Sequence, residues 1–404
     1  MPPLLFISPL RPNPAGTGAA QRAFHTLKIL GERFRIDLLV TADPGPLPDA
    51  TAQLVAKAVI LPPTRFRDPH YAWAMLRHSL AGAGLLPPSP QPDAWLQVTP
   101  RQLRLARRQM GPSTYAVIHA FRLSSAPFAW HCHRDHPGCR LHLDLDEAES
   151  GNLLRQADLL ERSGEPALAA RTLVHGQVWA GLEEEWLPRF QRLLVSSPKE
   201  AARLPQAQRP GELRVAPNIV DPPPELPSPL PLPAGPPSLL FVGSFGYYPN
   251  RDGVRYFLSE IAPRLRPTTP FRLVCVGYGL EGAFRRWLAD QEGVLLPGGV
   301  EDIVPWYRQA AAAVVPLRAG GGTRIKILEA FALGCPVVST TLGAEGLQVT
   351  AGRELLLADD PEGFAGHCRR LLGPASRREE LTQNAYRLVC ERYGDQALRE
   401  ALLD

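Results

Sequence analysis

The sequence predicts an α/β protein made of two parallel-sheet domains that are joined by a stiff linker. Short apolar runs alternate with helical patterns along nearly all of its 404 residues, which is typical of strands and helices layered in alternation. The alternation is interrupted at 222–238, where nine of seventeen residues are proline, a residue that disfavours helix and sheet. We therefore expect domains at 1–221 and 238–385, a proline-rich linker at 222–237 and a terminal helix at 386–404.

The first domain opens with a series of predicted strands. Their apolar runs lie at 4–10, 35–41, 57–62, 115–121, 141–146 and 192–197. Between about 66 and 110 the pattern is weaker, and we expect only two helices, around 70–80 and 101–110. The second carries a stripe of four arginines: Arg101, Arg104, Arg107 and Arg108. This stripe is either a solvated face or, with Trp95, Leu103 and Leu105, a surface that lies on an anionic membrane.

The second domain shows a new alternation directly after the prolines. Its apolar runs lie at 238–245, 271–277, 293–299, 311–317, 335–341 and 354–359. Because these runs are almost continuously apolar, they predict parallel strands buried on both faces. Open sheets of this kind bind ligands beyond the carboxyl ends of their strands, so that edge is where a site is expected.

Composition restricts the protein class. A formal charge of +4 over 404 residues is small, and we expect no nucleic-acid partner. Six cysteines without a paired framework predict reduced thiols in a cytoplasmic protein. The start lacks the pattern of a signal peptide, and no stretch approaches the roughly 18 apolar residues of a membrane span. The sequence therefore predicts a soluble protein.

The stretch "RAGGGTRIKILEAFALGCPVVST" at 318–340 carries the clearest chemistry. Its three glycines lie between a predicted strand and a predicted helix, where a backbone without Cβ atoms approaches a ligand closely and helix N–H groups are unpaired. Arg324 and Lys326 add two cations there, so the pattern favours an anion such as a diphosphate, at about 1.5–3 kcal/mol for each charge-assisted hydrogen bond. The alternative is an ordinary helix surface, with Lys326 paired to Glu329 and Arg324 solvated.

Five stretches together resemble glycosyltransferase family 4, in the branch with a glycine-rich GGGTRIKILEA motif. They are "GGGTRIKILEAFALGCPVVSTTLGAEGL", "VGSFGYYPNRDGVRYF", "SSPKEAARL", "APNIVD" and, at the front, "SPLRPNPAGTGAAQRAFHTLKIL". The likeness covers nearly the whole chain and is poor only at 62–110. It implies the GT-B fold, with two facing Rossmann-like domains and a C-terminal helix that packs back on the first.

The resemblance also implies an activity. Such enzymes are retaining and metal-independent, and they move a sugar from a nucleoside diphosphate to a hydroxyl of a glycan or lipid-linked acceptor, typically for cell-surface polysaccharide or glycolipid. No cofactor is needed, since the nucleotide sugar is the substrate. The expected location is the cytoplasm, including the inner face of the membrane. A GT-B nucleotide-sugar epimerase and a non-catalytic nucleotide-sugar-binding scaffold subunit are the alternatives.

The same resemblance assigns residues. Arg324 and Lys326 become the catalytic pair that neutralises the leaving diphosphate, and Glu329 holds the nucleotide ribose. Gly321 stands where the family's first glutamate touches the sugar. The expected donor-binding residues are Gly243, Ser244, Asn250, Gly277, Gly321, Gly322, Thr323, Glu329, Gly343, Ala344, Glu345 and Gly346. The expected acceptor-side residues are Gly16, Gly18, Arg22, His119 and Asp146.

Three further patterns carry alternatives. Gly277, Gly279 and Gly282 have the spacing of a dinucleotide fingerprint, but a tight turn beside the nucleotide is favoured, because they do not follow a first strand. Asp144, Asp146 and Glu147 end a strand, where they either cap the next helix or orient the acceptor. A histidine- and cysteine-rich stretch at 131–139, expected to be a loop, offers metal-ligand types at no standard spacing: His131, Cys132, His133, His136 and Cys139.

Overall fold

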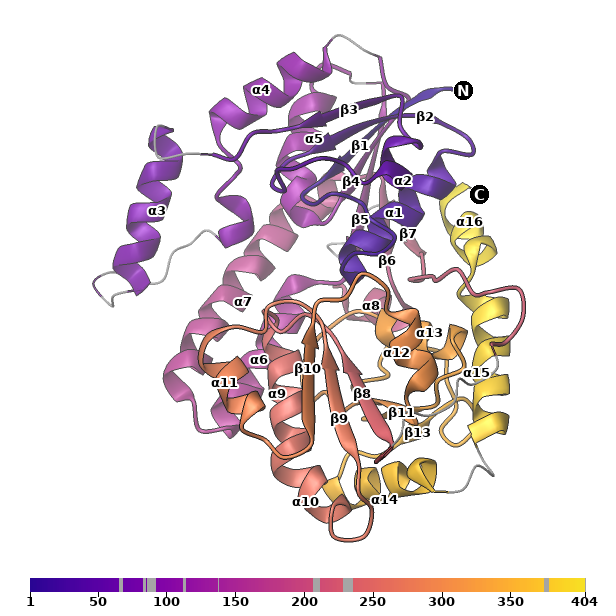
Figure 1. The fold of residues 1–404 in the computed structure, drawn as a ribbon. Coiled ribbons are helices and arrows are strands. Elements are labelled where there is room, and N and C mark those ends of the chain that lie inside the picture. Colours follow the sequence, from indigo (N-terminus) through magenta and orange to yellow (C-terminus); the bar gives the residue numbers. More distant parts are fainter. Residues whose placement is uncertain are drawn as a thin grey trace. The chain divides into compact units, whose positions relative to one another are not determined.

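The structure, a computed structural model, describes residues 1–64, 68–82, 85, 92–111, 114–136, 138–205, 211–227, 235–373 and 378–403. These residues form two compact units, one of Met1–Pro217 together with the chain from Arg399 onward, the other of Asn218–Leu398 (Figure 1). Each unit has its own apolar core around its own sheet. Part of the predicted linker, 228–234, lies outside the described residues.

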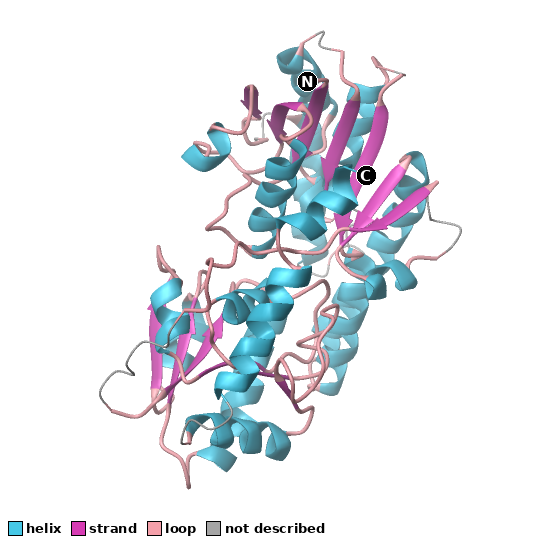
Figure 2. Ribbon diagram, turned by 90° about the vertical axis from the view of Figure 1, so that its right-hand side faces the viewer, coloured by secondary structure: helices cyan, strands magenta, loops and turns pink. Residues whose placement is uncertain are grey.

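The first unit contains a seven-stranded parallel sheet in the order β3-β2-β1-β4-β5-β6-β7. Its strands are β1 (Pro3–Ser8), β2 (Arg35–Val40), β3 (Lys57–Ile60), β4 (Val117–Phe121), β5 (Arg140–Asp146), β6 (Arg192–Val195) and β7 (Glu212–Val215). The first six were predicted, and β7 was missed. The central strands are buried along nearly their whole length because helices cover the sheet (Figure 2).

The helices of the first unit follow the strands in alternation. They are α1 (Gly18–Leu30), α2 (Asp49–Ala52), α3 (Pro69–Gly82), α4 (Pro100–Met110), α5 (Ala126–His133), α6 (Glu149–Arg162), α7 (Pro166–Trp186) and α8 (Pro198–Arg203). Thr99 and Ser197 cap α4 and α8 through side-chain oxygens that accept from backbone N–H groups. The prediction of a loop at 131–139 was wrong at its start, because α5 continues through His133.

The second unit contains a six-stranded parallel sheet in the order β10-β9-β8-β11-β12-β13. Its strands are β8 (Ser238–Val242), β9 (Arg272–Val276), β10 (Val294–Gly298), β11 (Ala312–Val315), β12 (Val337–Ser339) and β13 (Leu356–Leu357). All six were predicted. The expectation of burial was wrong for β10, whose residues alternate between partly buried and exposed, because it is an edge strand.

The helices of the second unit are α9 (Tyr248–Tyr256), α10 (Ala262–Leu265), α11 (Gly282–Ala289), α12 (Val304–Gln309), α13 (Ile325–Ala332), α14 (Pro361–Leu372) and α15 (Arg378–Arg392), and α16 (Asp395–Leu403) follows. The expected terminal helix is therefore two helices that break near Gly394. The end of α16 belongs to the first unit: Arg399 pairs with Glu32 at 2.7 Å, just beyond α1, and Arg33 donates to the Leu403 carbonyl. In the described part of the chain, no helix has the length and apolarity needed to span a bilayer.

Two parallel sheets with α/β alternation confirm the predicted fold class. In both sheets the strand order reverses once, between β1 and β4 and between β8 and β11. Ligands of open α/β sheets bind outside the carboxyl ends of the strands at such a reversal. The residues that follow these strands are therefore the first place to look for a site.

Candidate functional site

The carboxyl edge of the second sheet carries most of the predicted donor-binding residues. The strands run parallel, so the loops that follow β8, β9, β11 and β12 all start at this edge. They contain Gly243, Ser244, Gly277, Gly321, Gly322, Thr323, Gly343, Ala344, Glu345 and Gly346. The tertiary structure thus brings to one edge residues as far apart in the chain as Gly243 and Gly346.

The loops after β8 and β9 touch each other. Phe245 N–H donates to the Tyr278 carbonyl at 2.7 Å, and a Cβ placed on Gly277 would overlap the carbonyl oxygen of Gly243. Gly277 also has φ +145, a value that side chains disfavour. The glycines from 277 onward therefore make a tight turn against the first loop, which agrees with the turn interpretation.

Arg324 is a buried guanidinium whose hydrogen-bonding capacity is not filled. Only 8% of the residue is exposed, and it forms the N-cap of α13. Its Nη1 donates to the Gly321 carbonyl, whereas Nε and Nη2 have no hydrogen-bond partner within the described chain. Because the guanidinium is buried, the alternative of a solvated Arg324 is wrong. Unmatched buried charged donors cost stability. The two open donors fit an anion.

Gly320 makes room for this guanidinium. Its φ of +123 lies in a region that suits glycine, and a Cβ at this position would lie 2.5 Å from Nη2 of Arg324. Gly322 also has a positive φ, +65. The glycines therefore allow the backbone to turn and also leave space for the side chain of Arg324.

Lys326 lies beside it in an environment that disfavours its charge. Its Nζ donates to Oδ1 of Asn250 at 2.9 Å and sits 4.5 Å from the centre of the Phe241 ring. Asn250 is fixed in turn, because its Nδ2 donates to the Ser244 carbonyl at 2.8 Å. Burial, followed by the positive charge of Arg324, lowers the pKa of Lys326 to about 7, and Glu329 acts in the opposite direction. An arriving anion would reverse this destabilisation.

Glu329 is oriented by a buried tyrosine. The hydroxyl of Tyr307 lies 3.0 Å from Oε2 of Glu329 and 3.0 Å from the carbonyl oxygen of Lys326. Burial, and then the charge of Glu329, raise the pKa of Tyr307 well above its ordinary value, so the phenol stays protonated and donates. Tyr307 precedes Glu329 by 22 positions on a different helix, and no local pattern in the sequence indicated this pair.

Two side-chain contacts hold the loop between β11 and α13 at its ends. Near the start, Arg318 pairs with Asp252 at 2.7 Å and stacks over the Tyr256 ring. Near the end, Nδ2 of Asn218 donates to Oγ1 of Thr323 at 2.6 Å. Asn218 belongs to the predicted "APNIVD" segment, but its contact with Thr323 was not foreseen. Both ends of the glycine turn are therefore fixed, which preorganises its backbone.

The loop after β12 packs directly against the end of β11, the strand that leads into the glycine turn. Gly343 N–H donates to Oγ1 of Thr340 at 2.8 Å, and that hydroxyl donates to the Leu317 carbonyl at 2.5 Å. A Cβ at Gly343 would collide with Ser339 and with the Val315 carbonyl. The predicted residues 343–346 therefore lie next to the loop that carries the glycines.

The predicted acceptor-side residues lie in the first unit, and two of them form a buried ion network. Arg22 is 3% exposed and binds Asp144 through Nε and Nη2, the latter at 2.7 Å. Its Nη1 donates to the Ala216 carbonyl at 2.8 Å, and its Nε lies 3.6 Å from Asp146. With these bonds Arg22 is suited to position Asp146. Gly16 and Gly18 lie in the loop after β1 and at the start of α1.

His119, one of the expected acceptor-side residues, does not lie at the carboxyl end of its strand. It lies in the middle of β4, fully buried, where it stacks on Phe6 with ring centres 5.1 Å apart. Burial, followed by the charges of neighbouring groups, lowers its pKa well below the ordinary value. In the described structure His119 is a neutral core residue of the first unit.

Asp146 and Arg122 mark an unusual piece of backbone. They are the two non-glycine residues with positive φ in the described chain, at +64 and +61, and they pair with each other at 3.1 Å. Arg122 also pairs with Glu149 at 2.8 Å. Strained backbone of this kind costs about 1–3 kcal/mol per residue and clusters at functional sites. The alternative in which Asp144, Asp146 and Glu147 cap the next helix was wrong, because the N-cap of α6 is Ala148, without a side-chain bond.

The histidine- and cysteine-rich stretch does not converge on one point. Nδ1 of His133 lies 3.1 Å from Sγ of Cys139, but no third ligand atom from the described residues of 131–139 joins them within reach of a single ion. Burial raises the pKa of the Cys132 thiol to about 12. Cys132 and Cys139 belong to the apolar core of the first unit, and the three histidines are partly exposed.

One part of the chain matches the model of a known protein family. Residues 236–373, about a third of the chain, match a family model described as glycosyl transferases group 1. A protein of Klebsiella pneumoniae, "Uncharacterized 44.6 kDa protein in cps region", is 25% identical over 164 residues, which cover 39% of this chain and 42% of that one. The match thus spans less than half of that relative's length.

Solved structures are similar over nearly the whole chain. Sucrose-phosphate synthase (tll1590) from Thermosynechococcus elongatus has a TM-score of 0.69 at 17% identity, covering 99% of this chain and 97% of that one. Anabaena Alr3699/HepE in complex with UDP and glucose has 0.67 at 14%, covering 99% and 98%. WaaG, a glycosyltransferase involved in lipopolysaccharide biosynthesis, has 0.60 at 14%, covering 99% and 98%. At these identities the likeness establishes the GT-B fold.

Proposed function

We propose that this chain, whose residues 236–373 belong to the glycosyl transferases group 1 family and which has the GT-B fold, is a retaining, metal-independent glycosyltransferase. It moves a sugar from a nucleoside diphosphate to a hydroxyl of a glycan or lipid-linked acceptor. The observation that carries this proposal is Arg324, a buried guanidinium with two donors unfilled, beside a lysine whose ammonium form is destabilised.

The site supports a diphosphate as the ligand of these two cations. An anion at the glycine turn gains the open donors of Arg324, the charge of Lys326 and the N-terminal end of α13, and it needs no rearrangement of the turn. Because Arg324 and Lys326 oppose the helix dipole and each other when the site is empty, their destabilisation is relieved only when negative charge arrives. This is the pattern of a preorganised anion site.

In the proposed reaction, the bond between the sugar's anomeric carbon and the diphosphate breaks, and negative charge grows on the departing phosphate. Arg324 and Lys326 stabilise that charge, which a fixed electrostatic environment does better than water. The acceptor oxygen bonds to the anomeric carbon on the face that the phosphate leaves, which gives retention, and the departing phosphate takes the proton of that hydroxyl. Glu329, held by Tyr307, binds the ribose.

The donor's base is proposed to be uracil, and its sugar a hexose such as glucose. The support is the similarity to Anabaena Alr3699/HepE, whose solved complexes contain UDP, glucose and UDP-glucose. The partly similar Klebsiella protein comes from a cps region, which supports a role in cell-surface polysaccharide. The cytoplasmic face of the membrane is the corresponding place of action.

Calorimetric titration of UDP, GDP and ADP in chelator tests the proposal. Wild-type protein should bind one of them clearly better than the others, and the Arg324→Ala/Lys326→Ala variant should lose that binding. The matched control is Arg285→Ala/Arg286→Ala on α11, which removes two exposed cations of the same unit and should bind like wild type. Equal weak binding by wild type and the Arg324/Lys326 variant would refute the diphosphate site.

The epimerase and scaffold alternatives are separated by product analysis with UDP-glucose. A new glycoside formed on an acceptor supports the transferase. Epimerised or hydrolysed donor without any acceptor supports the epimerase. Tight donor binding with no product from any acceptor supports the scaffold, an alternative that the Gly321 position motivates.

A further inference from the structure

Helix α3 is an apolar helix that lies outside both cores. None of its side chains that the structure describes is buried, and none belongs to either apolar cluster. Trp73 is 66% exposed and Leu76 51%, and Leu85, just beyond the helix, is 71% exposed. Figure 1 shows α3 standing apart from the sheet of its own unit. A helix of this composition is normally buried, because isolated helices of this length are barely stable in water.

The segment around α3 and α4 is strongly basic. Residues 62–111 contain seven arginines, two aspartates and no lysine or glutamate, a net charge of +5, whereas the whole chain carries +4. The rest of the protein is therefore slightly acidic. A concentration of charge of this kind in one segment indicates an anionic partner.

The apolar helix and the basic helix start beside each other. Oγ1 of Thr99, the N-cap of α4, donates to Oδ2 of Asp68 at 2.8 Å. Oδ1 of the same aspartate accepts from the backbone N–H groups of His70 and Tyr71 in the first turn of α3. Asp68 is 2% exposed, so a single buried carboxylate ties the N-termini of the two helices together.

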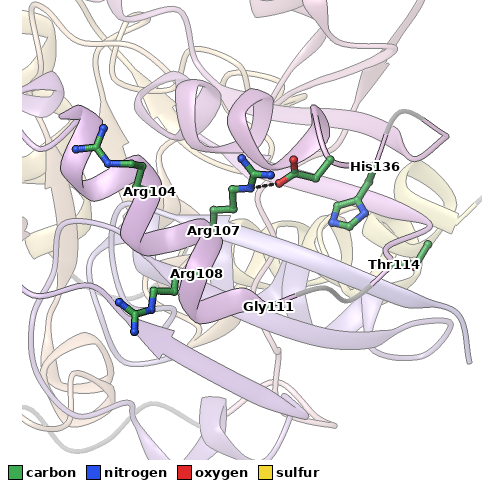
Figure 3. Close-up of a pocket in the computed structure, with 7 residues that line it drawn as sticks. Arg104, Arg107, Arg108, Gly111, Thr114 and His136 are labelled. Atoms are coloured by element: carbon green, nitrogen blue, oxygen red, sulfur yellow. Dashed lines mark ion pairs between the residues drawn. The ribbon is translucent and has the colours of Figure 1, made fainter.

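The arginines of α4 are exposed. In Figure 3, Arg104 and Arg108 extend from the helix without reaching a carboxylate among the residues drawn, whereas Arg107 pairs with Asp135. They line a shallow hollow of about 620 Å³ together with Thr114 and His136, the latter shortly before β5. The hollow is thus at the amino-terminal edge of the first sheet, and it is separate from the carboxyl edge where ligands of such sheets bind.

The apolar residues first assigned to this surface are not available to a partner. Trp95 is only 7% exposed, and Leu103 and Leu105 are partly buried against the core of the first unit. That part of the membrane interpretation was wrong, because α4 turns its apolar side to its own sheet. Helix α4 therefore offers a partner only its charged side chains, and the exposed apolar surface is on α3.

We propose that α3 inserts Trp73 and Leu76 into the interface of an anionic lipid bilayer, while Arg101, Arg104 and Arg108 contact the headgroups. The exposed and half-exposed residues of α3 are distributed around the helix. A lipid interface can contact such a helix on several sides at once. A second copy of the chain would set one basic segment against another, which is repulsive. The proposal is independent of the proposed transferase activity, but it gives a lipid-linked acceptor a place of delivery.

Co-sedimentation with phosphatidylcholine vesicles, with and without phosphatidylglycerol, tests the proposal on the full chain. Wild type should bind the anionic vesicles and bind the neutral ones much more weakly. Trp73→Glu/Leu76→Glu should reduce binding at least about tenfold, and Arg104→Gln/Arg108→Gln about 30-fold, at roughly a factor of five for each arginine near the surface. Trp73→Phe should retain binding.

The matched control is Leu168→Glu/Leu173→Glu on α7, two leucines of the same unit that are each 42% exposed. It should bind like wild type, and circular dichroism of each variant checks that the fold is kept. Wild type that ignores anionic vesicles, or unchanged binding by Trp73→Glu/Leu76→Glu, would overturn the proposal. A wild-type dimer that this variant converts to a monomer, without any vesicle binding, would overturn it in favour of a second copy as the occupant.

Discussion

The depressed pKa of Lys326 makes donor binding depend on pH. Only the ammonium form attracts the diphosphate, and in the free protein the pKa of Lys326 is about 7. A bound anion raises this pKa, so binding at alkaline pH must first supply a proton. The dissociation constant should therefore rise with pH by the factor 1 + 10^(pH − 7), which gives about 30-fold between pH 6 and 8.5.

Calorimetry with UDP-glucose measures this effect cleanly, because its diphosphate diester does not titrate in that range. Lys326→Arg keeps its charge at every pH and should show a flat profile, and Lys326→Met should bind weakly with a flat profile. At pH 8 the measured binding enthalpy of wild type should change with the ionisation enthalpy of the buffer, because binding takes up a proton. The binding enthalpies of the two variants should not depend on the buffer. A wild-type profile as flat as that of Lys326→Arg would refute the reasoning.

The remaining predictions concern neighbouring contacts. Lys326→Met should raise the free energy of unfolding of the empty protein by about 1–2 kcal/mol, because it removes a half-buried charge whose desolvation outweighs the attraction of Glu329; urea denaturation at pH 6 measures it, and a loss of stability would contradict it. The sign follows from the depressed pKa: the penalty is fully present below pH 7 and disappears as the pH rises toward the unfolded-state pKa of 10.5. Tyr307→Phe removes the donor that orients Glu329 and should weaken UDP binding about 5–30-fold while leaving inorganic diphosphate binding unchanged; equal effects on both ligands in calorimetry would argue against a ribose role. Arg22→Met leaves Asp144 charged and buried and should destabilise the protein by about 3–5 kcal/mol in thermal or urea unfolding, and Arg22→Met/Asp144→Leu should recover part of that loss.

Local sequence patterns predicted the fold well where an element is strongly apolar. The buried strands of both sheets follow from continuous apolar runs, and their parallel arrangement follows from the helices between them. β7 was missed because "ELRV" has only two apolar residues. The end of α5 was predicted as a loop because its last residues are mostly polar, although the helix buries Phe128 and Cys132 and continues through His133.

The sequence by itself determined the parts of the site that are close in the chain. Three glycines, Arg324, Lys326 and Glu329 lie within ten positions, so a strand-to-helix turn with two cations was predictable from spacing. Only the tertiary structure decided what each side chain does. Lys326 donates a hydrogen bond to Asn250, 76 positions away in the chain, and Thr323 accepts one from Asn218, 105 positions away. The fold buries Arg324 and half-buries Lys326, which leaves Arg324 with two unfilled donors and lowers the pKa of Lys326 to about 7. Burial depends on the whole fold, and for that reason no local pattern could supply it.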